Sequence, residues 1–282
     1  QRLNFFDSFT GVINVKNLNK TIYLKGGFGN VLFQILAYRI IKKSNKIKYI
    51  DILVKRNIFT KLLGWTIHEG VYKDFIGKNE VRSASCIRVV GILFLGFLSR
   101  KFKFTNNICT FYSDKNRLKM PYSDNNFGYF QDKYFLEENQ IELLKLGREL
   151  FNKYKKNESE IIVHYRLGDS GWAKEYENYY IKVRNMIMLE NETVYIATDS
   201  PKEALSFFSD CSNVKLTDSE NAMDDFKYMV SATKLYCAPS TFSWWAAHSL
   251  SGESQVIMPD FFENKLGIYI NKNRLTLLDS NA

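Results

Sequence analysis

The second half of the chain alternates strand-like and helix-like stretches, and this alternation constrains the fold more than any other feature. Apolar runs of strand length lie at 160–165, 193–197, 213–216, 234–238 and 255–259, the last strand we predict. Helical spacing is found between and after them, at 222–233 and 242–250. Strands that alternate with helices form a parallel sheet covered on both faces. We therefore predict an α/β fold.

One helix start in this half has a recognisable sequence signature. Ser200 precedes Pro201, which suits the first helical position, and Glu203 follows three residues after the serine. This pattern predicts a capping box in which the Ser200 hydroxyl caps the helix.

The first half opens with a strand, a glycine-rich loop and a helix. Residues 21–24 are typical of a strand, Gly26, Gly27 and Gly29 form the loop, and a helical pattern begins at Asn30. The loop is not a P-loop, because no Gly-Lys-Ser/Thr follows. It either lets a ligand phosphate or a reacting group approach main-chain amides, or serves as a tight strand-to-helix turn. Residues 47–54 predict a further strand.

Charge divides the chain into two halves. Residues 1–155 carry 27 Lys/Arg and 12 Asp/Glu, a net charge of +15, and residues 156–282 carry a net charge of −6. The sign changes at the most polar stretch, 152–160, so we predict two domains, 1–155 and 156–282. A basic domain can face nucleic acid, anionic lipid or phosphorylated substrates.

Membrane and redox signals are weak. The longest apolar run, 89–98, is too short to span a bilayer and predicts either a buried element or an interfacial anchor between basic flanks. Four isolated cysteines favour reduced thiols in a cytoplasmic protein.

Polar residues follow several predicted strands, where ligands bind in open α/β sheets. Arg166, two residues after His164, has a planar fork suited to phosphate, although a local ion pair with Asp169 is an alternative. Ser240, Thr241 and Ser243 begin a helix and predict either an anion site or plain N-capping. Asp224 and Asp225 begin another helix, where a carboxylate either binds guanine or complements the helix dipole.

Two further features bear on this site. Trp244 and Trp245 are adjacent on the helix after the serines, and we interpret them as core or domain-interface residues. No cluster of metal ligands is recognisable, so we predict no metal.

Four stretches together resemble the bacterial α1,2-fucosyltransferases, inverting enzymes that use GDP-fucose. Three match the pattern of that family with small departures: GGFGNVLFQ at 26–34, GYFQDKYF at 128–135 and HYRLGDS at 164–170. The fourth, STFSWWAA at 240–247, matches fully. The four occur in family order across residues 26–250.

The resemblance implies a GT-B-like fold, with two Rossmann-like domains facing across a cleft, and a metal-independent reaction without a cofactor. Arg166 would bind the pyrophosphate, His164 and Asp225 would lie near guanine, and Asn30 would act beside the pyrophosphate. The remaining donor contacts would come from Gly27, Phe28 and Gly29 and from Ser240, Thr241, Phe242 and Ser243. Asp169 is the first candidate for the general base, with Glu175 and Glu177 in reserve.

Two positions depart from the family pattern. Leu167 replaces its second arginine, so one phosphate contact is lost or is supplied by a lysine elsewhere. Ser170 replaces an aromatic residue.

The implied reaction moves fucose to the 2-hydroxyl of a galactose in a bacterial surface glycan such as an O-antigen. A lipid-linked acceptor would bring the basic domain to the anionic inner face of the inner membrane. Alternatives are transfer to protein or from another nucleotide sugar, a nucleotide-sugar-binding protein without turnover, and a non-catalytic nucleic-acid binder. No recognised stacking platform supports the last, and we predict no nucleic-acid partner.

Overall fold

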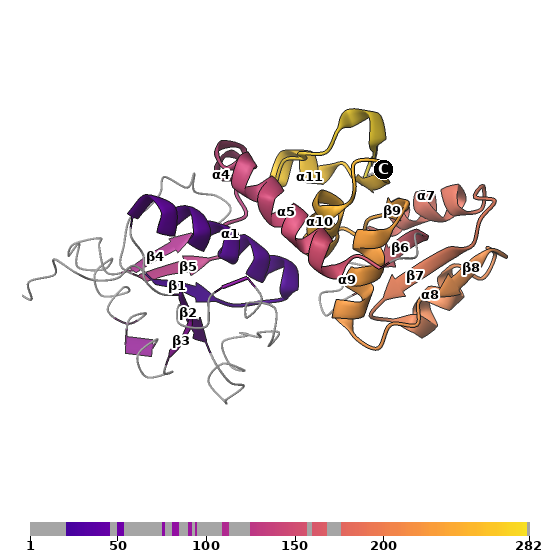
Figure 1. Cartoon of the computed structure of the whole chain (residues 1–282). Coiled ribbons are helices and arrows are strands. Elements are labelled where there is room, and N and C mark those ends of the chain that lie inside the picture. The colour runs from indigo at the N-terminus through magenta and orange to yellow at the C-terminus, as the bar shows by residue number, and fades with distance from the viewer. Residues whose placement is uncertain are drawn as a thin grey trace, which may run out of the picture.

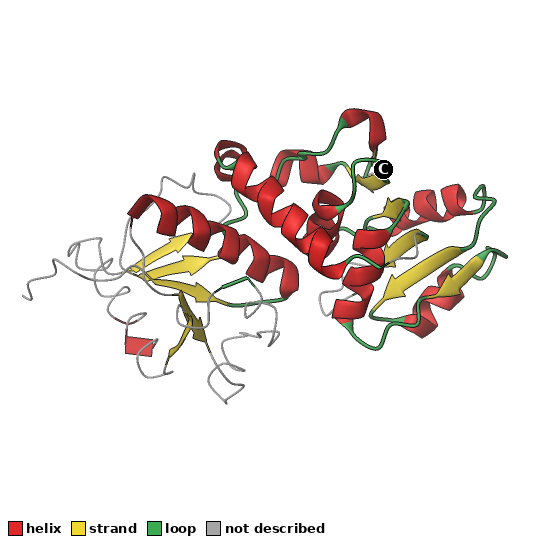
Figure 2. Cartoon of the chain, in the orientation of Figure 1, coloured by secondary structure: helices red, strands yellow, loops and turns green. Residues whose placement is uncertain are grey.

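The computed structural model describes residues 21–45, 50–53, 75–76, 81–84, 90–91, 94, 109–112, 125–156, 160–167 and 176–280. Within these residues the chain forms two parallel β-sheets with helices packed against them (Figures 1 and 2). The expected α/β fold with two Rossmann-like domains, the GT-B-like arrangement, is confirmed by this topology.

The first sheet has the strand order β3-β2-β1-β5-β4. Its strands are β1 (Thr21–Leu24), β2 (Ile50–Leu53), β3 (Val81–Ala84), β4 (Cys109–Tyr112) and β5 (Asn125–Gly128). Helix α1 (Phe28–Asn45) follows β1 after the glycine loop, as predicted, but begins two residues earlier. The order reverses direction between β1 and β5, which makes this the switch point of the sheet.

The second sheet has the order β11-β10-β9-β6-β7-β8, with its switch point between β6 and β9. Its strands are β6 (Ile161–Tyr165), β7 (Val194–Thr198), β8 (Val214–Leu216), β9 (Lys234–Tyr236), β10 (Gln255–Pro259) and β11 (Leu275–Leu278). Helices described after α1 include α4 (Lys133–Glu138), α5 (Gln140–Tyr154), α7 (Glu177–Ile187), α8 (Pro201–Phe207), α9 (Ala222–Ser231), α10 (Thr241–Ser249), α11 (Phe261–Lys265) and the 3-10 helix η3 (Lys272–Arg274).

Both faces of the second sheet are covered. Successive side chains of a strand point to opposite faces, so Ile162 joins the cluster under α9 and α10 while Ile161 and Val163 join the cluster under α7 and α8. Strands buried on both faces explain why this half of the sequence contains near-continuous apolar runs.

The hydrophobic core runs without interruption from one domain to the other. Phe33 of α1 packs against Trp244 and Trp245 of α10, with ring centroids 5.0 Å apart in both pairs. Both tryptophans are fully buried, so the prediction that they are packing residues is confirmed. Helix α5 lies between the sheets in Figure 1 and packs against α1, α9 and α10.

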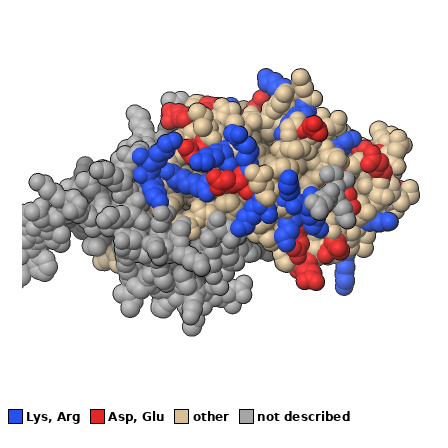
Figure 3. All heavy atoms as spheres, viewed as in Figure 1, with Lys and Arg blue, Asp and Glu red and all other residues tan. Residues whose placement is uncertain are grey.

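Ion pairs hold α1 and α5 together. Arg39 and Lys43 of α1 pair with Glu149 and Glu142 of α5, each at 2.8 Å. Lys and Arg side chains gather across the middle of the face in Figure 3, over α1 and α5. The domain boundary at 155/156 stays a prediction.

Two sequence-based expectations are wrong. Ser200 stands at the N-cap of α8, but its hydroxyl donates to Asp199 and makes no capping hydrogen bond. The strand at 255–259 is not the last, because β11 pairs with it in parallel.

Most of the predicted buried element or interfacial anchor at 89–98 lies outside the described residues. Of the apolar run 89–98, only Val90, Gly91 and Phe94 are described, and all three are exposed. In the described part of the chain, no helix combines the length and apolar character that crossing a bilayer requires.

Candidate functional site

The carboxyl edge of the second sheet carries polar groups on both sides of its switch point. Arg166 follows β6, and the turn at Pro239–Ser240 leads from β9 into α10. In open parallel sheets, ligands bind at this place because two diverging loops leave a crevice between them. The topology thus brings together the two polar stretches that the sequence singled out.

The serine-rich turn is a well-formed helix start. The Ser240 hydroxyl accepts a hydrogen bond from the Phe242 amide at 3.2 Å, which caps α10. The first amides of a helix lack intrahelical acceptors and carry the positive end of its dipole. The start of α10 can therefore attract an anion, and N-capping is also present.

Ser243 lies below the turn. Its Oγ accepts from the Ala238 amide at 2.9 Å and shares a 2.5 Å hydrogen bond with Nδ1 of His164. Both side chains are buried, and the His164 ring packs against Phe242. This pair locks the end of β6 to the beginning of α10.

Arg166 lies at the surface of the same edge. Its Nε is 3.9 Å from the Asp199 carboxylate at the end of β7, and both side chains are largely exposed. Tyr180 holds the Arg166 backbone, since its hydroxyl accepts from the amide at 3.1 Å and donates to the carbonyl at 3.2 Å. A long, exposed ion pair contributes little energy, so the guanidinium can turn toward a ligand.

Asp225 occupies the first turn of α9, beside the end of β8. The Thr217 hydroxyl donates to its carboxylate at 3.4 Å. Burial raises the pKa of Asp225, and repulsion from Asp199 and Asp224 adds to the rise, while hydrogen bonds from Ser219 and Thr217 oppose it. A half-buried carboxylate in this position is suited to accept hydrogen bonds from a base or a hydroxyl.

Close packing explains why one position of the glycine loop must be glycine. A Cβ on Gly29 would lie 2.6 Å from the backbone of both Thr241 and Phe242. The backbone that approaches Gly29 closely is therefore the start of α10. Gly27 differs, because a Cβ there would meet nothing within 4 Å.

Asn30 joins the two switch points. Its Oδ1 accepts from the Thr241 hydroxyl at 3.1 Å and from Nε2 of Gln131 at 2.6 Å. Gln131 follows β5, on the far side of the switch point of the first sheet. One side chain thus connects loops from β1, β5 and β9.

The loop after β5 is strained. Phe130 is buried and has φ of +57°, a left-handed conformation that bulky residues rarely adopt. Such strain persists where the surrounding structure fixes it, often near functional sites. It directs Gln131 toward Asn30 while the Phe130 ring stays in the core.

An aromatic layer closes the site from below. Phe28 packs on Phe226 and Phe242, at centroid distances of 4.7 and 5.5 Å. The contact between the domains is therefore apolar underneath and polar at its rim.

Of the residues predicted for the site, the structure places the glycine loop, Asn30 and the start of α10 in one contact region. His164 lies beneath α10, and Arg166 and Asp225 lie at the ends of neighbouring strands. Asp169 and Glu175 lie outside the described residues, and Glu177 is exposed at the start of α7. The roles assigned to all of them stay predictions.

Several residues of this region were not singled out from the sequence. Gln34 is fully buried and clamps Lys25, accepting from its amide at 2.8 Å and donating to its carbonyl at 2.9 Å. A polar residue within the apolar pattern of α1 was the available signal. Asp199 belongs to the polar stretch ATDS, 197–200, which the sequence marks as a strand end with polar groups, whereas Tyr180 had no comparable signal.

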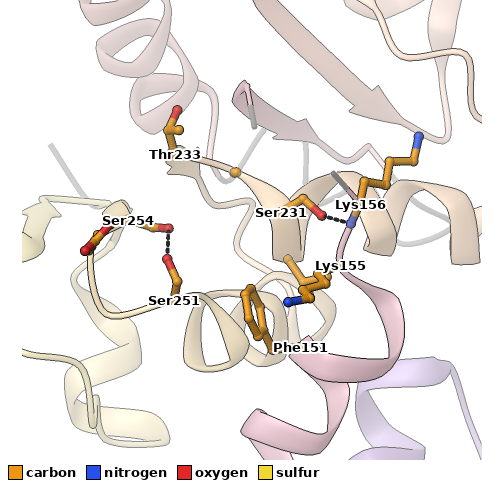
Figure 4. Close-up of a pocket in the computed structure, with 10 residues that line it drawn as sticks. Phe151, Lys155, Lys156, Ser231, Thr233, Ser251 and Ser254 are labelled. Atoms are coloured by element: carbon orange, nitrogen blue, oxygen red, sulfur yellow. Dashed lines mark hydrogen bonds between the residues drawn. The ribbon is translucent and has the colours of Figure 1, made fainter. Parts of the chain in front are cut away.

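A separate pocket of about 180 Å³ lies elsewhere, near the amino ends of β9 and β10 (Figure 4). Its lining includes Lys155, Lys156, Ser231 and Ser254. It opens at the sheet edge opposite the candidate site. Among the described residues, no group of three or more His, Cys, Asp or Glu side chains is placed to hold a metal ion.

No protein-family model and no curated protein sequence matches this chain. Solved structures do align over most of its length. The fucosyltransferase NodZ from Bradyrhizobium is 12% identical, with 87% of this chain and 96% of that chain covered and a TM-score of 0.45. The E. coli heptosyltransferase WaaC with ADP is 10% identical, with 92% of both chains covered and a TM-score of 0.49. POFUT1 in complex with GDP is 10% identical, with 86% and 98% covered and a TM-score of 0.39.

Matches at this level do not assign an activity. The expectations for donor, acceptor, linkage and stereochemistry therefore stay predictions after the comparison.

The close approach at Gly29 generates a first prediction. Gly29→Ala places a methyl group against the backbone of α10, which cannot yield as a flexible side chain would. We expect a loss of about 1–3 kcal/mol in the free energy of unfolding. Gly27→Ala, in the same loop, is the matched control and should stay within about 0.5 kcal/mol of wild type. Urea unfolding measures both, and equal effects of the two variants would contradict the close approach.

His164 generates a second prediction. Burial, and to a lesser degree Arg166, lowers its pKa from 6.5 to about 3. The unfolded chain therefore takes up this proton near pH 6.5, and the folded protein only near pH 3. Below pH 6.5 the unfolded state gains protons, so the free energy of unfolding falls as pH decreases, by about 1.4 kcal/mol per pH unit for this group.

The test compares wild type with His164→Asn in urea unfolding between pH 6 and pH 4. The variant should lose stability less steeply, by about 1.4 kcal/mol per pH unit. His248, whose pKa is also lowered to about 3 by burial, is present in both proteins and cancels. Identical slopes would show that His164 is not held neutral.

Proposed function

We propose that this chain is an inverting glycosyltransferase that moves fucose from GDP-fucose to the 2-hydroxyl of a galactose in a bacterial surface glycan. The observation that carries the proposal is the meeting of two switch points, joined by Asn30, with a guanidinium and a helix start at one of them. The four matching stretches support the choice of donor.

The donor would bind to the second domain. Arg166 and the first amides of α10 would contact the diphosphate, and Asp225 would accept hydrogen bonds from guanine. A positive helix end and an arginine fork favour the same kind of ligand, because both stabilise oxygen-borne negative charge.

The reaction would be a direct displacement. The acceptor oxygen forms a bond to the anomeric carbon while the bond from that carbon to the β-phosphate oxygen breaks. The electron pair of the broken bond stays on the phosphate, so negative charge grows there. Arg166 and the α10 amides would stabilise this charge, and such stabilisation is usually the largest catalytic contribution.

The proton of the acceptor hydroxyl needs a base. Asp169 remains the proposed base because it belongs to the same loop as Arg166, with Glu177 as the described alternative.

The acceptor would approach from the first domain. Exposed basic side chains on α5, Lys145 and Arg148, continue into Lys155 beyond it. We propose that this positive face meets the anionic membrane surface that a lipid-linked acceptor would provide.

Arg166→Ala tests the phosphate contact. We expect kcat/KM to fall about 10²–10³-fold, the usual cost of removing one charge-stabilising donor. Lys272→Ala, at an exposed lysine of η3 just before β11, is the control and should keep wild-type activity. Steady-state kinetics with GDP-fucose measures both, and turnover of Arg166→Ala within threefold of wild type would refute the phosphate role.

Product analysis tests the reaction itself. Incubation with GDP-fucose and a panel of β-galactosides in EDTA should give α-linked 2-O-fucosyl products, identified by NMR, at the rate seen without EDTA. GDP-mannose should give no product. Transfer from GDP-mannose instead would favour another donor, and activity lost in EDTA but restored by Mn²⁺ would refute the metal-free reaction.

A further inference from the structure

The proposed site contains few positive charges to stabilise the diphosphate leaving group. In the family that the sequence resembles, two arginines follow the strand equivalent to β6, but here the second position is Leu167, which packs against the apolar cluster beneath α7 and α8. Arg166 and the start of α10 then face a leaving group with several negative charges. A helix N-terminus contributes only about half an elementary charge.

A lysine stands at the switch point of the other sheet. Lys25 is the first residue after β1, directly before the glycine loop, and it is half-buried. The double hydrogen bond from Gln34 fixes its backbone against α1. The fold thus places the base of this side chain firmly at the carboxyl edge of the first sheet, where ligands bind.

The Lys25 side chain spans that switch point. Its Nζ lies 4.7 Å from the ring centroid of Tyr129, which follows β5. Gly26, the next residue, passes close to Tyr129 and Asn30, since a Cβ added there would lie 3.0 Å from both the Tyr129 ring and Nδ2 of Asn30. Asn30 in turn touches the Thr241 hydroxyl. The ammonium, the Tyr129 ring and Asn30 therefore all lie beside the glycine loop, and Asn30 contacts the start of α10.

The surroundings of Lys25 also favour an anionic ligand. Burial lowers the pKa of the Lys25 ammonium. The contact of the ammonium with the Tyr129 ring is a weak interaction compared with a hydrogen bond between two charged groups. A phosphate oxygen would stabilise the charged form further through a charge-assisted hydrogen bond.

We propose that the Lys25 ammonium contacts the diphosphate of the bound donor from the side of the first domain and supplies the second positive charge that Leu167 does not. This inference rests on the proposed function. As the bond between the anomeric carbon and the β-phosphate oxygen breaks, the electron pair remains on that oxygen, and Lys25 and Arg166 share its stabilisation from opposite domains.

Lys25→Met tests the proposal because it keeps the length and apolar stem of the side chain and removes the charge. We expect kcat to fall about 100-fold and the Kd for GDP to rise about tenfold. Lys25→Arg should retain most activity. Lys42→Met, at the exposed end of α1, is the matched control and should behave as wild type.

Guanosine separates a phosphate contact from a structural role. It lacks the diphosphate, so Lys25→Met should bind guanosine as wild type does while binding GDP more weakly, as measured by calorimetry. Equal weakening of both ligands would show a structural role. An increased KM for the acceptor with unchanged GDP affinity would place Lys25 on the acceptor. Either result overturns the proposal, and Lys25→Gln replaces the methionine variant if that variant does not fold.

The same measurements distinguish failure of the inference from failure of the proposed function. If wild type binds GDP, Arg166→Ala loses activity and Lys25→Met is unchanged, only the role of Lys25 is wrong. If wild type binds no GDP and transfers no fucose, the proposed function and this inference both fall.

Discussion

The contact between the beginnings of α1 and α10 is the constraint on which the rest of the structure depends. Gly29 leaves no room for a side chain between the two backbones, and Asn30 seals the contact by accepting from Thr241 and Gln131. Because each helix starts at the carboxyl edge of its own sheet, this single contact brings two ligand-binding edges together. A chain without it could form both sheets and still have no shared site.

The packing below the contact makes this arrangement rigid. Phe28, Phe226 and Phe242 form an aromatic layer, and Phe33 inserts against the tryptophans of α10. Interfaces within a chain are usually more polar and permit relative domain motion. Here the core is continuous, so we infer that the domains hold their relative position and that ligand binding adjusts exposed side chains such as Arg166.

Much of the second domain could be predicted from the sequence, because buried parallel strands leave continuous apolar runs and α9 and α10 keep helical spacing. The two predictions that were wrong depended on a side-chain hydrogen bond and on the pairing of a short strand. The Ser200 hydroxyl turns to Asp199 instead of capping α8, and local spacing cannot distinguish these two partners. Strand β11, "LTLL", is short and follows polar residues, so nothing in its pattern required a place beside β10.

The site could be predicted in outline only. The glycines, Asn30 and the serine turn were recognisable. The sequence could not show that position 29 is glycine because the start of α10, and not a ligand, packs against it. The contacts of Gln34 and Lys25 can be seen only in the fold. Gln34 reaches across the glycine loop to the Lys25 backbone, and Lys25 reaches across the switch point to Tyr129.

The most direct measurement of the central claim is a crystal structure with bound GDP. The account predicts the diphosphate within hydrogen-bonding distance of Arg166 and the first amides of α10, beside Asn30. Phosphates bound elsewhere, for example between Lys155 and Lys156 at the opposite edge of the second sheet, would contradict it.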